Sequence, residues 1–297
     1  MNAVAPLLAH RPTCGCALHA RRRLGGWLLA GGALAAAPAW AREGVDVGPK
    51  SGFSKLVSAE QIEQAAQQQY AQLLQQAAQK GAVSGRGSGD PQLARLRAIA
   101  ERLIPSTYEW NERARQWRWE VNLLNSASIN AFCMPGGKIA FFAGILDKLK
   151  LTDDEVAMVM GHEMAHALRE HARERIGKTA ATQGAIEIGA ALFGLGNGGR
   201  YLAGMGGQLL TMKFGRDDES EADLVGMELA ARGGYDPHAG VTLWKKMAAA
   251  SKNAPPQFLS THPSGPSRIR DIEVNLPKVE PLYARAEKPA RRFDPGR

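Results

Sequence analysis

Residues 151–175 read LTDDEVAMVMGHEMAHALREHARER, and this stretch says more about the fold than any other. Residues 152–155 (Thr-Asp-Asp-Glu) match a capping box, in which a threonine and a glutamate three residues later close the first turn of a helix. Apolar residues follow at helical spacing. The sequence therefore predicts a helix from Thr152 to about Arg175.

His162, Glu163 and His166 form an H-E-x-x-H pattern inside this predicted helix. Residues i and i+4 lie on one helical face, so the two imidazoles can bind one zinc ion. Glu163 borders the same face and can take a proton from water at the metal. Two buried histidines and an acid without such a partner would destabilise the helix.

A catalytic zinc site needs a third protein ligand, and residues 219–223 (Glu-Ser-Glu-Ala-Asp) offer one. Glu219 and Asp223 share a helical face, so one can ligate while the other accepts a hydrogen bond from a ligand histidine. Glu221 points elsewhere, and we expect it to face solvent. Taken alone, this acidic run would indicate a solvated helix face. The upstream H-E-x-x-H pattern favours the interpretation that it supplies a zinc ligand.

The rest of the chain predicts an α+β fold that is mostly helical with a small sheet. Alternating apolar residues indicate strands at 117–123 and 138–142. Helical spacing and helix-start residues indicate helices at 59–80, from Asp90-Pro91 onward, at 217–232 and at 237–250. The Gly-rich stretch 185–210 is either a helix–loop–helix excursion or a membrane span.

The amino terminus predicts export. Arg21 to Arg23 precede an apolar run, Leu24 to Ala37, and Ala39-Trp40-Ala41 suits cleavage after Ala41. The alternative is a single membrane anchor, although the run is short for a span of about 20 residues. Both the ordinary secretory and the twin-arginine routes fit this segment.

Charge and cysteine content limit the partners and the covalent cross-links that the chain can have. The chain carries a net charge of +8, and removing the four arginines of the predicted signal leaves +4, which does not predict a nucleic-acid partner. Only Cys133 lies after residue 41, so an intramolecular disulfide is excluded in the processed chain.

Four motifs in order resemble the zinc metallopeptidases numbered forty-eight in peptidase classification. They are residues 130–137 (Asn-Ala-Phe-Cys-Met-Pro-Gly-Gly), 162–166, 219–226 and Thr261-His262-Pro263 followed by Arg268. The resemblance covers about residues 91–277 and is closest to the periplasmic branch of the family. It implies a zincin-like domain with one Zn²⁺ per chain, Glu219 as third ligand and Asp223 beside a ligand histidine.

The resemblance also implies roles for three further features. It places an active-site edge strand after Gly137, at 138–142, to which an extended peptide could add; Lys138 would be a solvated charge there. His262 is either a fourth ligand that keeps the enzyme latent, a substrate contact or a buried structural histidine. Arg268 is either an oxyanion stabiliser or a salt-bridge partner.

We expect no metal role for two other histidines. His171 follows His166 by five residues and should point off the metal face, into solvent or as a capping residue. His238 stands beside Pro237 and suits a helix start.

These observations predict a zinc metalloendopeptidase that cleaves unfolded or misassembled cell-envelope proteins. The alternative is a chaperone or assembly factor with latent proteolysis. Expected partners are unfolded polypeptides and the outer-membrane assembly machinery, in the periplasm or associated with a membrane, with no membrane span in the processed chain. The predicted divisions are a signal at 1–41, a helix and linker at 42–90, the peptidase domain at 91–277 and an extended tail at 278–297.

Overall fold

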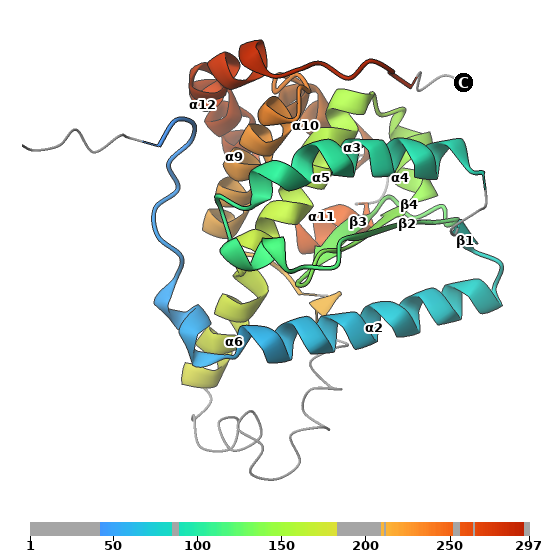
Figure 1. Ribbon diagram of the computed structural model, residues 1–297, viewed down its shortest axis with the longest axis vertical. Helices are drawn as coiled ribbons and strands as arrows, with labels where there is room; N and C mark the ends of the chain where they lie inside the picture. Colours follow the sequence, from blue (N-terminus) through green and yellow to red (C-terminus); the bar gives the residue numbers. More distant parts are fainter. Residues whose placement is uncertain are drawn as a thin grey trace, which may run out of the picture. The chain divides into compact units, whose positions relative to one another are not determined.

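A mixed four-stranded sheet lies at the centre of the computed structural model (Figure 1). The structure describes residues 42–84, 89–182, 209–210, 212–251, 256–263 and 265–293. The strand order is β1-β2-β4-β3. β2 and β4 are parallel, whereas the outer pairs are antiparallel. The strands are β1 (Val83–Ser84), β2 (Glu120–Leu124), β3 (Ala131–Met134) and β4 (Lys138–Phe142).

Helices cover both faces of this sheet (Figure 1). On one face, α2 (Ala59–Gln79) buries Ala66 and Tyr70 against Met134 and Ala140. On the other, α3 (Pro91–Thr107) and α5 (Asp153–Leu168) share the main core with the opposite side chains of the strands. The alternating apolar pattern of the strands is thus satisfied on both faces.

The other described helices pack against α5, against the strands or against one another. The described residues from Glu43 onward belong to one compact unit. These elements are the 3-10 helices η1 (Gly52–Leu56) and η2 (Glu112–Arg115), and the helices α4 (Ala143–Leu149), α6 (His171–Thr182), α9 (Arg216–Arg232), α10 (Ala239–Ala250), α11 (Gln257–Thr261) and α12 (Pro266–Arg285).

Two predicted helix starts are confirmed in atomic detail. Thr152 accepts a hydrogen bond from the Glu155 amide, and the Glu155 carboxylate accepts one from the Thr152 amide. Asp90 caps α3 through the amides of Gln92 and Leu93. Side-chain caps of this kind satisfy amides that have no partner within the helix.

Two predicted element boundaries and the predicted exposure of Lys138 are wrong. The helix from Thr152 ends at Leu168 and a new helix starts at His171, since Glu170 takes a left-handed conformation with φ 63°. The tail predicted to be extended from residue 278 is helical to Arg285, and α12 contains both Pro277 and Pro281. Lys138 is buried rather than solvated, and its ammonium group donates to the Arg118 carbonyl at 2.6 Å.

Helices α5 and α9 cross at a pair of glycines. A Cβ atom on Gly161 would lie 2.5 Å from the Gly226 carbonyl oxygen, and one on Gly226 would lie 2.5 Å from the His162 amide nitrogen. Both distances are too short for any side chain. The two backbones can therefore approach only because both positions are glycine.

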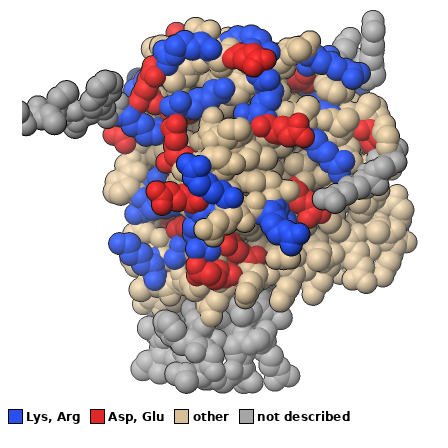
Figure 2. Space-filling view, viewed as in Figure 1, with Lys and Arg blue, Asp and Glu red and all other residues tan. Residues whose placement is uncertain are grey.

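On the face in Figure 2, Lys and Arg are interspersed with Asp and Glu. The surface near the C-terminal half of α2 is largely uncharged, as expected from residues 64–79, which contain no charged residue. Within the described residues, no helix combines the length and hydropathy needed to span a membrane. The predicted signal, 1–41, and almost all of 185–210 lie outside the described residues.

We expect Gly226→Ala to lower the free energy of unfolding by about 1–3 kcal/mol, because the added methyl group overpacks the helix crossing. This loss outweighs the intrinsic helical gain of about 1 kcal/mol. Urea unfolding measures it, with Gly52→Ala as control because a Cβ there meets nothing within 4 Å. Equal stability of the two variants would contradict a glycine-dependent crossing.

Candidate metal centre

Helix α5 carries His162, Glu163 and His166 inside the protein. Each side chain is at most 4% exposed. The Nε2 atoms of His162 and His166 lie 3.1 Å apart. One face of the capped helix thus presents two imidazole nitrogens to a common point.

Two further donors approach the same point from other elements. Glu219 lies on α9, with a carboxylate oxygen 3.6 Å from His162 Nε2 and another 3.5 Å from His166 Nε2. His262 follows α11, and its Nδ1 lies 3.3 Å from His162 Nε2 and 3.0 Å from Glu219. His162, His166, Glu219 and His262 together form a cluster that could hold a metal ion.

The chemistry and spacing of this donor set fit zinc. Tetrahedral zinc with bonds of about 2.0–2.1 Å places its ligand atoms about 3.3 Å from one another. Five distances between the donor groups, 3.0–3.6 Å, bracket that value, and the four donor atoms all lie within 4.8 Å of one another. Unprotonated imidazole nitrogens that face one another repel unless a cation or a proton lies between them. The residues present therefore fit the zinc ion that the sequence predicts.

Asp223 and Arg268 support the His162 side of the cluster. Asp223 Oδ1 lies 3.0 Å from His162 Nδ1, the nitrogen opposite the cluster. Arg268 donates to both oxygens of Asp223 and to Glu219, each at 2.6 Å, and stacks over Trp244. Burial would raise the pKa of Asp223, but Arg268 and His162 lower it below its ordinary value. Of the two roles predicted for Arg268, the structure thus shows the salt bridge.

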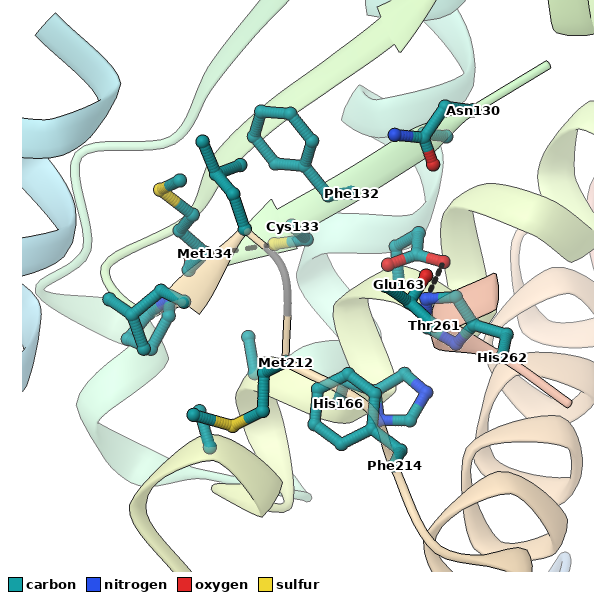
Figure 3. Close-up of a pocket in the computed structure, with 16 residues that line it drawn as sticks. Asn130, Phe132, Cys133, Met134, Glu163, His166, Met212, Phe214, Thr261 and His262 are labelled. Atoms are coloured by element: carbon teal, nitrogen blue, oxygen red, sulfur yellow. Dashed lines mark hydrogen bonds and ion pairs between the residues drawn. The ribbon is translucent and has the colours of Figure 1, made fainter. Parts of the chain in front are cut away.

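Glu163 faces the cluster without belonging to it (Figure 3). Its carboxylate lies 3.6 Å from His262 Nε2 and accepts a hydrogen bond from the Cys133 backbone. Its Oε1 is buried and accepts no hydrogen bond from the residues that the structure describes. Burial raises the pKa of Glu163, although His262 and His162 oppose the shift. A buried carboxylate with one oxygen free of hydrogen bonds, beside a candidate metal cluster, suits a general base.

A partly apolar pocket opens between β3 and α5 beside Glu163 (Figure 3). Met212 and Phe214 form one side of it, and Phe214 stacks on the His166 ring with centroids 4.0 Å apart. Phe132 and Met134 of β3 line the other side. Glu163 itself lines this pocket.

The predicted edge strand is the wrong one. β4 pairs with β2 on one side and β3 on the other, so the 138–142 backbone cannot accept a further strand. Within the described part of the chain, β3 ends the sheet on the pocket side. The Phe142 amide donates to Asn130, so alternate residues Ala131 and Cys133 direct their backbone groups away from β4.

Sequence reasoning missed two residues near the cluster. His171 is 1% exposed, and its Nδ1 lies 2.9 Å from His166 Nδ1, so the expectation that it faces solvent is wrong. Glu221 is also not fully solvated: it pairs with Arg169, and its side chain is 22% exposed. No glycine or proline stands at Glu170, so the sequence gives no sign of the helix break there. His238 stands at the start of α10 and is exposed, as expected.

Comparisons with known proteins agree with the cluster. The pattern of Peptidase family M48 matches residues 91–275. Mitochondrial metalloendopeptidase OMA1 of Schizosaccharomyces pombe is 38% identical over 166 residues, which cover 55% of this chain and 48% of that protein. Beta-barrel assembly-enhancing protease of Yersinia pestis is 27% identical over 205 residues, covering 65% and 40%. Its Escherichia coli counterpart is 27% identical over 176 residues, covering 56% and 36%. The chain thus spans about half or less of the length of these relatives.

We expect Arg268→Met to lower the free energy of unfolding of the metal-free protein by about 3–5 kcal/mol, because it leaves two buried carboxylates without their cation. Urea unfolding measures the loss. Arg285→Met, which removes an exposed ion pair to Glu43, is the control and should change stability by less than about 1 kcal/mol. A similar small effect of both substitutions would contradict a stabilising role for Arg268.

Proposed function

Because the chain belongs to peptidase family M48, we propose that it is a zinc metalloendopeptidase that cleaves unfolded or misassembled cell-envelope proteins. The observation that carries this proposal is the pairing of a zinc-compatible donor set with Glu163, a buried carboxylate with one oxygen that accepts no hydrogen bond from the described residues. Structural zinc sites do not need such a carboxylate beside them, whereas hydrolytic sites do.

Each residue has a separate role in the proposed reaction. His162, His166 and Glu219 would hold the metal. When bound, zinc would supply a Lewis acid that lowers the pKa of water to about 7 and polarises a carbonyl. Glu163 accepts the proton of the attacking water and then donates it to the leaving amine. Its buried carboxylate lies beside the donor set, 3.6 Å from His262 Nε2, and this position suits both transfers.

We propose that substrates bind by strand addition to β3, rather than to β4. The backbone groups of Ala131 and the Cys133 carbonyl point to the open edge of the sheet, next to Glu163 and the pocket, whereas the Cys133 amide already donates to Glu163. An extended peptide can pair with such an edge through backbone hydrogen bonds, largely independent of its sequence. Folded proteins seldom offer extended backbone with free hydrogen-bonding groups, so this mode favours unfolded segments.

Location and partners follow from the sequence and from the relatives. The segment 1–41 supports export, with the periplasm as the proposed site of action and a membrane-associated form as the alternative. Relatives named mitochondrial metalloendopeptidase support proteolysis but not this compartment. The relatives named Beta-barrel assembly-enhancing protease support outer-membrane assembly machinery as a partner.

A second function, that of a chaperone or assembly factor with latent proteolysis, is favoured by His262. Catalytic zinc sites have three protein ligands and leave a fourth position for water or substrate. Here His262 contributes a fourth donor atom to the cluster and is buried. We propose that His262 occupies that position in the latent enzyme and leaves it when substrate binds.

We expect Glu163→Gln to reduce kcat on an unfolded model protein by about 10²–10⁴-fold, because the amide cannot accept a proton. Metal analysis should give one zinc per chain in both proteins. Glu273→Gln, on the exposed face of α12, is the matched control. Cleavage within tenfold of wild type by the Glu163 variant would contradict its role as general base.

We expect His262→Ala to raise kcat/KM at unchanged zinc content. If His262 blocks the site in about nine of ten molecules, its removal raises activity about tenfold. His238→Ala, an exposed histidine outside the cluster, serves as control. A loss of activity in the His262 variant would refute the latch and would instead indicate a contact with substrate.

A further inference from the structure

His171 is a buried histidine that the proposed reaction does not use. It starts α6 directly after the left-handed residue Glu170. Left-handed backbone in a residue other than glycine is strained, and such strain persists only where surrounding contacts enforce it. This turn directs the His171 side chain back onto α5, against the ring of His166. The two ring centroids lie 4.9 Å apart at 76°.

The hydrogen bond between these rings has a direction if His166 binds a metal. His166 Nε2 is the nitrogen that faces His162 and Glu219. A neutral imidazole carries one proton, so His166 must hold its proton on Nδ1 when Nε2 offers a lone pair. His171 Nδ1 lies 2.9 Å from that atom and must accept the hydrogen bond. The proton of His171 then resides on its Nε2.

Glu221 completes this arrangement. Its Oε2 lies 3.5 Å from His171 Nε2, an atom that makes no hydrogen bond among the described residues. The other oxygen of Glu221 accepts from Arg169, which holds the carboxylate in place. A carboxylate near Nε2 favours the tautomer that carries the proton there.

The result matches the arrangement around the other ligand histidine. Asp223, held by Arg268, faces Nδ1 of His162. His171, with Glu221 held by Arg169, faces Nδ1 of His166. Partners of this kind fix the tautomer and ring orientation of a metal ligand.

We propose that His171 is a positioning residue, which accepts the Nδ1 hydrogen bond of His166 and so presents its Nε2 to the zinc ion. This inference rests on the metal site of the proposed function and adds a residue to it. A buried histidine that only filled space would have a different requirement. It would tolerate any side chain of similar volume, whereas a positioning residue needs a hydrogen-bond acceptor where Nδ1 lies.

Two substitutions separate these roles. His171→Leu fills the space but cannot accept a hydrogen bond. His171→Asn is smaller but can place its amide oxygen near the position of Nδ1. We expect His171→Leu to weaken zinc binding about 10–100-fold, as is typical for such partners, and His171→Asn to remain closer to wild type.

The measurement is the zinc dissociation constant of the full chain, by competition with a chromophoric chelator. The visible spectrum of the Co²⁺-loaded protein reports the ligand geometry independently of activity. Thermal unfolding of the metal-free variants verifies the fold, and His238→Leu is the control for loss of a histidine at a helix start. A changed Co²⁺ spectrum in His171→Leu only, together with its weaker zinc binding, supports the inference.

Two results for the His171 variants would overturn the inference. Zinc binding by His171→Leu within threefold of wild type would show that no acceptor is needed. Equal losses in His171→Leu and His171→Asn would show that only the packing of the imidazole matters. Wild type that binds zinc but does not cleave would overturn the proposed function and leave the role of His171 standing. Wild type that binds no zinc would overturn both.

Discussion

The close crossing of α5 and α9 is the constraint on which the metal centre depends. Helix α5 buries two histidines and a glutamate, which would destabilise the core without polar partners. Helix α9 supplies those partners, but a carboxylate side chain is short and needs the two backbones close together. The glycine pair Gly161 and Gly226 allows that approach, one residue before His162 and three after Asp223. Packing and chemistry are therefore set by the same contact.

The carboxylates buried at this crossing carry negative charge that a cation would stabilise. Glu163, Glu219 and Asp223 bring three carboxylates into a site where Arg268 is the only guanidinium that contacts them among the described residues. With neutral histidines, two negative charges remain, which is the charge that a divalent ion neutralises. The raised pKa of Glu163 has the same origin, since burial penalises a carboxylate that lacks full compensation.

The sequence predicted those parts of the site that depend on local spacing. The capping box, the H-E-x-x-H helix and the shared face of Glu219 and Asp223 follow from helical periodicity. Edge-strand identity does not, because it depends on the order β1-β2-β4-β3, which no local pattern contains. β3 is only four residues long, which is too short for its sequence pattern to distinguish it from a loop. The helical tail to Arg285 was missed since its two prolines normally end a helix, whereas packing of Val279 and Leu282 into the core holds it.

The error at His171 shows where helical periodicity stops being a guide. Counting five residues from His166 assumes an unbroken helix, and Glu170 breaks it without a residue type that announces a break. Glu221 was assigned to solvent for another reason, its rotation away from Glu219 and Asp223 on α9, but Arg169 and His171 bring a second layer of side chains to that face. Successive residues of a helix are rotated by about 100°, so Glu219 and Asp223 share one side of α9 and Glu221 occupies another. Three acids within five residues thus serve different neighbours: the cluster itself, His162 and His171. An acidic run that resembles a solvated surface in sequence is, in the fold, divided among the side chains in and around the candidate metal cluster.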